Sequence, residues 1–395
     1  MAFAYFTQKF NLLFLRVLDK LSKVWGKLEA SAMGNSNTWR MRNMKKLQSL
    51  ATAGAVALTA LVLVACGGGK KTATTTTSTG NNSVKIVSGT YIIPQDADAA
   101  NGYKYLALNL SVKNNGIKEN FYSSSFSLKS KDGSKIKTEY VDDSDDETFK
   151  GMDNEKLDKG EKAKGYVVFK VKPKTKYTLE FEPYGDGGKD VKKSELKVNT
   201  GKYLDQTADG QKALKAYIDN VFMGLNDKDY DTLVANDLDA ERKTYATEVR
   251  SYLEKDVVDD PLTDSAFTKM LGQLQAANVK AGAAKYQVEY AYPTKVKIEV
   301  TPTVYSLTDM SSEISDLTSE LMKKDTSDKY DYDQLERMAK EYFVASFDKV
   351  LADLKPTSSD YGNDIELVKT DGKWKIDTSS DDYETFAEPF TGDQY

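Results

Sequence analysis

The chain has 395 residues, of which 40% are hydrophobic and 29% charged, and this length predicts two globular domains. Residues 1–65 hold nine basic and two acidic side chains, so the remainder carries a net charge of −12, which argues against a nucleic-acid partner and against a folded part lying on an anionic membrane. There is no histidine and one cysteine, Cys66, which excludes Ser-His-Asp and Cys-His sites, most zinc sites and an intrachain disulfide. Acid–base catalysis by Asp, Glu, Tyr or Lys stays open.

The first segment, residues 1–40, has apolar residues at helical spacing with basic residues mostly off that face, which is typical of a basic amphipathic helix. Two interpretations stay open. In the first, translation begins at Met41 or Met44. In the second, residues 1–40 are translated, lie on the cytoplasmic leaflet of the membrane and are lost when the signal peptide is cleaved.

Residues 41–65 have the pattern of a signal peptide. A basic stretch precedes an almost wholly apolar run of about 19 residues that ends at Ala65, before Cys66. The run Leu63-Val64-Ala65-Cys66 resembles the lipobox of bacterial lipoproteins of Gram-positive type. The resemblance implies cleavage before Cys66 and a diacylglycerol group on its sulfur, in place of a retained membrane span. Two acyl chains hold a protein firmly on a membrane, because each buried CH₂ contributes about 0.8 kcal/mol.

Residues 66–82 follow as a Gly- and Thr-rich spacer without large apolar side chains, so we expect a flexible tether. Residues 83–200 then alternate with a period of two. Turn signals, among them Asp132-Gly133, separate about seven short strands, which predicts an antiparallel β-sandwich.

Three motifs of this first domain resemble the immunoglobulin-like, telokin-like domain of bacterial surface lipoproteins. They begin at Tyr105 (Y-x-x-L-x-L-x-V-x-N-N-G), Ser125 (S-F-x-L-x-x-x-D-G) and Leu157 (L-x-x-G-E-K-x-x-G-Y-V-V-F). The resemblance implies an extracellular binding or spacer module without catalytic residues. Residues 142–147 hold five carboxylates, which calcium could use, but they lack the spacing and central glycine of an EF-hand, so we expect a solvated hairpin tip.

The second domain, residues 205–395, changes to helical periodicity. Helices are expected over 209–225, 226–234, 238–258, 264–279, 308–324 and 331–354. Strands are expected over 286–290, 295–300, 364–369 and 373–376, the last two joined by an Asp371-Gly372 hairpin. Helices before a sheet that ends in D-G-K-W-K-I resemble the cystatin-like, nuclear-transport-factor-like α+β cone. The fold class is therefore α+β, a β-sandwich followed by a helix-rich cone-like domain.

Five aromatic residues could line an apolar pocket of the cone, although ordinary core packing is the expectation: Tyr217, Phe222, Tyr290, Tyr292 and Trp374. No motif marks a catalytic, cofactor-binding or metal site. The sequence thus predicts a non-enzymatic binding or structural module of the cell envelope, held on the outer face of the membrane by lipid on Cys66. Its partner is an unknown extracellular protein or ligand. A carboxylate-dependent extracellular hydrolase and a transporter-associated solute-binding protein are the alternatives.

Overall fold

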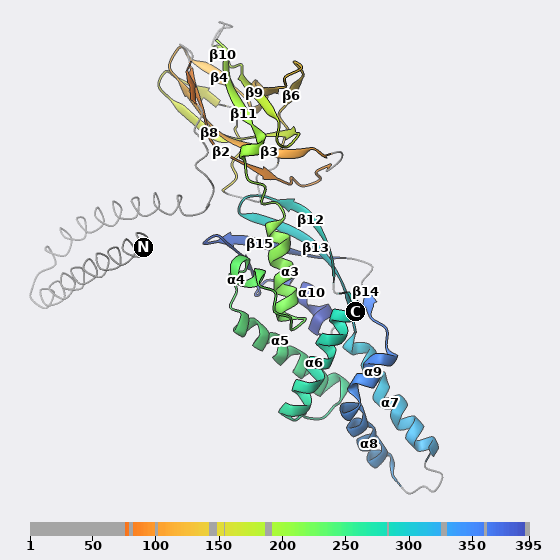
Figure 1. The fold of residues 1–395 in the computed structure, drawn as a ribbon. Coiled ribbons are helices and arrows are strands. Elements are labelled where there is room, and N and C mark those ends of the chain that lie inside the picture. The colour runs from red at the N-terminus through yellow and green to blue at the C-terminus, as the bar shows by residue number, and fades with distance from the viewer. Residues whose placement is uncertain are drawn as a thin grey trace, which may run out of the picture. The chain divides into compact units, whose positions relative to one another are not determined.

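The computed structural model describes residues 76–78, 82–98, 102–141, 148–153, 155–185, 192–282, 284–324, 330–358 and 362–391. All of them belong to one compact unit, Gly69–Tyr395. The predicted α+β class is confirmed: antiparallel sheets form the N-terminal part, and helices around one antiparallel sheet form the C-terminal part (Figure 1). The predictions for residues 1–65, for Cys66 and for the acidic run 142–147 lie outside the described residues.

The N-terminal part consists of three antiparallel sheets. The first has the order β1-β2-β3-β8, the second β11-β9-β5-β6 and the third β10-β4-β7. The strands are β1 (Thr76–Ser78), β2 (Asn82–Ile92), β3 (Lys104–Asn114), β4 (Glu119–Phe121), β5 (Phe126–Lys129), β6 (Lys135–Lys137), β7 (Glu155–Leu157), β8 (Lys162–Val171), β9 (Lys176–Phe181), β10 (Tyr184–Gly185) and β11 (Ser194–Asn199).

Alternation of apolar residues explains the sandwich core. Strand β3 buries Leu106, Leu108, Leu110 and Val112 completely, because side chains two apart point to the same face. These side chains join one hydrophobic cluster with residues of the opposite sheet such as Phe181.

Strand β1 corrects one expectation, because it lies inside the segment predicted to be a flexible tether. Thr76, Thr77 and Ser78 pair antiparallel with Lys85, Val84 and Ser83 of β2. The edge of β2 offers backbone donors and acceptors, and β-branched threonines suit a strand, so a segment with no apolar side chain still pairs.

The C-terminal part has one sheet, of order β12-β13-β15-β16, with β14 pairing on β13. Its strands are β12 (Ala284–Ala291), β13 (Lys295–Val304), β14 (Thr357–Ser358), β15 (Asn363–Thr370) and β16 (Lys373–Ile376). Its helices are α3 (Asp209–Val221), α4 (Asp229–Leu233), α5 (Leu238–Tyr252) continued by the π-helical turn η5 (Leu253–Val257), α6 (Asp264–Ala281), α7 (Leu307–Lys324), α8 (Tyr332–Ala345), α9 (Phe347–Asp353) and α10 (Asp381–Thr391). None of these helices is long and apolar enough to cross a membrane.

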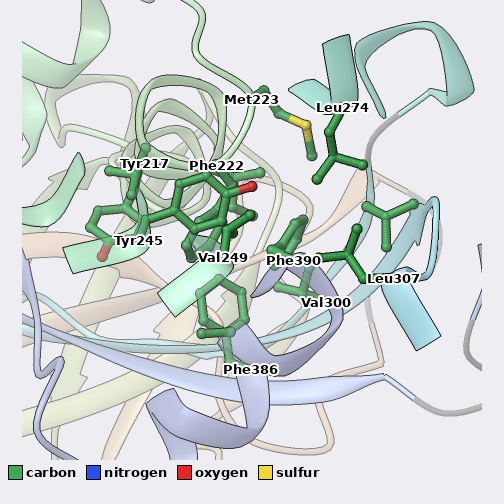
Figure 2. Close-up of a cluster of buried hydrophobic side chains, with 14 of the residues drawn as sticks. Tyr217, Phe222, Met223, Tyr245, Val249, Leu274, Val300, Leu307, Phe386 and Phe390 are labelled. Carbon is green, nitrogen blue, oxygen red and sulfur yellow. The ribbon is translucent and has the colours of Figure 1, made fainter. Parts of the chain in front are cut away.

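The C-terminal core gathers the apolar faces of the helices on one face of this sheet. Figure 2 shows Phe222 of the α3 end beside Phe386 and Phe390 of α10, with Val300 of β13 nearby. The rings of Phe222 and Phe390 stack at 4.4 Å. Three segments far apart in the sequence therefore share one core.

The structure differs from the expected helices in two places. The helix expected over 331–354 ends at Ala345 and restarts at Phe347, with Ser346 between the two helices. Helix α10 lies beyond the last element that the sequence predicts, and it carries Pro389 in its interior. The helix forms because burial of Phe386, Ala387 and Phe390 outweighs the hydrogen bond that Pro389 cannot donate.

The five aromatic residues are core residues, as expected. Tyr217, Phe222 and Trp374 belong to the C-terminal core. Tyr290 and Tyr292 belong to a small cluster with sandwich residues such as Phe149. Next to this cluster the backbones of Ile93 and Ala291 exchange two hydrogen bonds, of 2.9 and 2.8 Å.

The fully buried Tyr217 keeps its hydroxyl group satisfied through a polar network. The hydroxyl lies 2.9 Å from a carboxylate oxygen of Glu241 and 2.7 Å from the Tyr383 hydroxyl. Asn236 donates to the other Glu241 oxygen at 3.0 Å and binds the backbone of Ile376. The network joins α3, α5, α10 and the end of β16.

Candidate anion-binding site

A groove of about 440 Å³ lies on the β-sandwich between the middle of β2 and the end of β11. We call it the lysine groove. Its described lining residues come from β2, from the paired ends of β9 and β11, and from the turn after β11: Ile86, Val87, Ser88, Lys176, Tyr177, Lys197, Val198, Asn199, Lys202 and Tyr203.

A β-bulge shapes the floor of the lysine groove. The pairing of β2 with β3 shifts between Ile86 and Ser88, so Val87 has no partner on β3 and is 36% exposed. A bulge bends its strand and aims a side chain away from the regular face.

The ring of Tyr203 forms one wall because Gly89 leaves room for it. A Cβ atom at position 89 would lie 2.6 Å from a ring carbon of Tyr203, which is closer than real Cβ contacts allow. A glycine at position 89 therefore allows the Tyr203 ring to approach the backbone of β2.

Three lysines give the groove its charge. Lys176 and Asn199 are paired in the β9–β11 register, Lys197 lies two residues before Asn199, and Lys202 ends the following turn. Among the described residues, no carboxylate forms an ion pair with any of the three, and none lines the groove. Lys197 donates to the hydroxyl of Thr178 at 3.1 Å. The groove therefore carries three positive charges that its own walls leave uncompensated.

The remaining polar groups of the lining are also able to donate hydrogen bonds. The Ser88 hydroxyl, the Asn199 amide and the Tyr203 hydroxyl belong to the lining. Burial, with the nearby Tyr91 phenol, raises the pKa of Tyr203 to about 12, so its phenol keeps its proton at neutral pH. The Asn199 side-chain oxygen accepts from the backbone of Gly201, which leaves the amide NH₂ for other partners.

The lining is held by a tightly bonded turn. The Thr200 hydroxyl lies 3.1 and 3.0 Å from the carbonyl oxygens of Lys172 and Thr175, to either of which it can donate, and it accepts from the backbone N–H of Thr175. Tyr91 donates to the carbonyl of Thr200 at 3.0 Å. The site is therefore preformed by strand ends and one turn.

Two more lysines lie on the loop that this turn fastens. The Lys172 ammonium lies 5.3 Å from the centre of the Tyr103 ring, and a Cβ atom at Gly201 would lie 3.2 Å from the Cα of Lys174. A cluster of ammonium groups and neutral donors without a carboxylate is chemically suited to an anion.

A second charged cluster lies on the sheet of the C-terminal part. One carboxylate oxygen from each of Glu289, Glu299 and Asp364 lies within 4.8 Å of the others. Lys297 binds Asp364 at 2.7 Å and Glu289 at 3.0 Å, and these hydrogen bonds raise the pKa of Lys297 above its usual range. The cluster contains its own cation, so we interpret it as a surface ion network.

The site residues predicted from the sequence, Leu63, Val64, Ala65 and Cys66, lie outside the described residues, so the structure does not bring them into a site. Sequence reasoning missed the lysine groove. The available signal was the run Lys172-Pro-Lys174-Thr-Lys176, with the next carboxylate only at Glu180. The pairing of β9 with β11, which adds Lys197 and Lys202, could not be read from that run.

The fold defines an α+β protein, a β-sandwich followed by a helix-rich domain around an antiparallel sheet. Residues 200–391 match a family described as "Domain of unknown function (DUF5105)", and residues 70–191 match "Domain of unknown function (DUF4352)". A relative, "Uncharacterized lipoprotein YcdA" of Bacillus subtilis (strain 168), is 24% identical over 322 residues, which are 76% of this chain and 84% of the relative.

A crystal structure of the ycdA protein from Bacillus subtilis has the same fold. It superposes with a TM-score of 0.61 at 21% identity and covers 80% of this chain and 98% of that chain. The resemblance to uncharacterised bacterial lipoproteins that the sequence indicated is thereby confirmed.

Proposed function

We propose that this chain is a non-enzymatic binding protein anchored by lipid to the outer face of the cell membrane. We further propose that the lysine groove of its sandwich binds an anionic ligand. One observation carries the binding proposal: every polar side chain of the described lining can donate a hydrogen bond or carries a positive charge, and none is acidic. Such a lining stabilises a negative charge and disfavours a cation.

The anchor is supported by two independent observations. The run Leu63-Val64-Ala65-Cys66 follows a basic and then an apolar segment, and the relative that spans 76% of this chain is named a lipoprotein. The absence of histidine and of a second cysteine from the sequence supports a binding role over catalysis.

Fractionation of cells that produce the Cys66→Ser variant tests the anchor. Without the sulfur no thioether to lipid forms, so we expect the chain in the soluble extracellular fraction or as an uncleaved precursor. Thr59→Ser, a conservative change inside the apolar run, is the control and should stay in the membrane fraction. Unchanged membrane retention and processing of Cys66→Ser would refute the anchor.

Calorimetric titration of the purified full chain with inorganic phosphate tests whether the groove binds an anion. The triple variant Lys176→Gln, Lys197→Gln, Lys202→Gln should bind at least tenfold more weakly. The matched control is Lys156→Gln, Lys159→Gln, Lys164→Gln, which removes three exposed charges from the same sandwich outside the groove. Equal loss in both variants would mean that overall charge, not the groove, attracts the anion.

A further inference from the structure

We infer that the ligand of the lysine groove is a phosphodiester-linked polyol or sugar polymer, recognised through its phosphates and its carbon backbone together. The inference rests on the proposed function and names the class of anion. Four properties of the groove support it: the kind of cation, the size, the apolar walls and the spread of charge.

The first property is the choice of cation. Residues 81–200 contain 21 lysines and no arginine. Arginine binds a carboxylate or a phosphate with two parallel hydrogen bonds, whereas lysine acts as a point charge without a fixed geometry. Lysine is a common phosphate ligand in proteins, so a groove whose cations are all lysines suits a phosphodiester.

The second property is size. The groove has a volume of about 440 Å³, and a water molecule takes about 30 Å³ of liquid. A lone tetrahedral anion is a few times larger than water and would leave most of this space to solvent. The volume falls in the range of about 300–1,000 Å³ that small-molecule sites have.

The third property is the mixed wall. Val87, which is 36% exposed, gives the groove apolar carbon surface, and the half-buried Tyr203 adds an aromatic ring whose hydroxyl can donate a hydrogen bond. Carbon surface and a phenol side by side suit the C–H groups and hydroxyls of a polyol or sugar. An inorganic anion would gain nothing from them.

The fourth property is the continuation of positive charge beyond the groove. Lys172 and Lys174 lie on the loop before β9, whose backbone packs against the turn that carries Lys202, and no described carboxylate forms an ion pair with either. A ligand with phosphates at regular intervals would meet charge at more than one point. The next part of the chain, residues 201–395, carries 23 basic and 39 acidic side chains, so the polymer is expected to bind the sandwich alone.

The experiment compares four probes on the full chain purified in detergent: inorganic phosphate, glycerol 3-phosphate, an oligomer of poly(glycerol phosphate), and heparin, a sulfated polyanion. We expect the oligomer to bind at least tenfold more tightly per phosphate than inorganic phosphate, with glycerol 3-phosphate between them. Vesicles of phosphatidylglycerol form a fifth arm, because their headgroup presents the same phosphodiester on a lipid surface.

Two variants separate the contributions. Lys176→Gln, Lys197→Gln, Lys202→Gln should abolish the preference for the oligomer. Val87→Trp fills the groove without changing its charge, at a side chain that is already exposed, and should weaken the oligomer at least fivefold while inorganic phosphate binds as before. Circular dichroism of both variants verifies that the sandwich is folded, and Val87→Leu replaces Val87→Trp if it is not.

The outcomes distinguish the two proposals. If inorganic phosphate and heparin bind as tightly as the oligomer, the groove is an anion site and the polyol class is overturned. If the vesicles bind more tightly than the soluble oligomer, the ligand is a lipid headgroup and the polymer is again overturned. If no probe binds, the proposed anion-binding function is refuted. The lipid anchor is then tested only by fractionation of the Cys66→Ser variant.

Discussion

The β-sandwich and the C-terminal part differ in their net charge and in how their charged groups are buried or paired. Residues 81–200 hold 21 basic and 19 acidic side chains, and the described part of this range buries the carboxyl groups of Glu119 and Glu180. Residues 201–395 carry a net charge of −16, and their buried polar groups include the Tyr217 phenol, held in its network, and the Asp219 carboxylate, paired with Lys215. Some surface acids of the C-terminal part lie in ion networks such as that of Lys297.

This difference indicates which part is suited to binding. A domain with a large negative net charge repels anions, whereas a nearly neutral sandwich can concentrate positive charge locally without a large net charge. The lysines of the groove are such a local excess. Each prediction below changes one of the two parts and asks whether the other responds.

The largest effect is expected from truncation of one core ring in each part. Phe181→Ala in the sandwich and Phe222→Ala in the C-terminal core each remove a ring that is at most 1% exposed, which costs about 3–5 kcal/mol of the free energy of unfolding. Because the two cores are separate hydrophobic clusters joined through the smaller cluster of Phe149, Tyr290 and Tyr292, thermal denaturation should show two transitions, and each variant should lower one of them. A single transition that both variants shift equally would show that the chain unfolds as one unit.

The next effect concerns the pH dependence of the sandwich through Glu119. Its side chain is fully buried, Asn82 donates to one oxygen at 2.9 Å, and the other oxygen has no hydrogen-bond partner. Burial raises the pKa of Glu119 from 4.5 to about 7 in the folded chain. The folded state then holds a proton that the unfolded state releases, so this contribution to stability is complete below pH 4.5 and is lost as pH rises through 7.

The loss amounts to about 3 kcal/mol between pH 4.5 and 7, and Glu119→Gln should abolish it because an amide does not titrate. Urea denaturation at both pH values measures the difference. A variant that keeps the full pH dependence would place the titrating group elsewhere.

Glu180 should titrate with the opposite sign. Its carboxylate is 1% exposed and lies 2.7 Å from the Lys193 ammonium and 3.2 Å from that of Lys135. Burial raises the pKa of Glu180, but the hydrogen bonds from the two lysines outweigh burial and hold the pKa below its usual value. This contribution is therefore present at neutral pH and is lost as the carboxylate is protonated in acid.

Glu180→Gln should cost about 1–2 kcal/mol at pH 7, less than a fully buried pair, because its lysine partners are a third to a half exposed. The cost should shrink in acid, where the wild-type carboxylate is also neutral. Denaturation at pH 7 and pH 3 tests both statements, and a cost that grows toward pH 3 would contradict them.

In the C-terminal part, Tyr217→Phe tests whether the buried phenol matters beyond its ring. The change removes one hydroxyl and leaves Glu241 and Tyr383 each without a bond that they make in the network, which costs about 1–2 kcal/mol. Tyr252→Phe, whose hydroxyl makes one exposed contact with Thr308, is the matched control and should change stability by under about 0.5 kcal/mol. Equal effects of the two variants would mean that the network contributes nothing.

The α+β class and most of the elements could be predicted because they depend on local pattern. Period-two alternation identified strands such as β3 and β8, and the Asp371-Gly372 turn located the β15–β16 hairpin. Helix α10 was not predicted because it carries a proline and is stabilised by burial in a core built from distant segments. Strand β1 was not predicted because its residues are polar, although it pairs with the adjacent strand β2. The break at Ser346 escaped because α8 and α9 have the same helical periodicity on either side of it.

The sequence by itself determined what rests on composition and order along the chain. The absence of histidine, the position of Cys66 behind an apolar run and the difference in charge between the two parts are of this kind.

Only the tertiary structure decided which charged groups lie close to one another. Strand pairing brings Lys176 beside the end of β11, and the turn after β11 adds Lys202 to the same groove. The fold also places Glu180 among lysines from three segments, while Glu119 is buried with the side-chain amide of Asn82 as its partner. Electrostatic energy depends on distance and burial in three dimensions, so two glutamates that look alike in sequence acquire opposite pKa shifts.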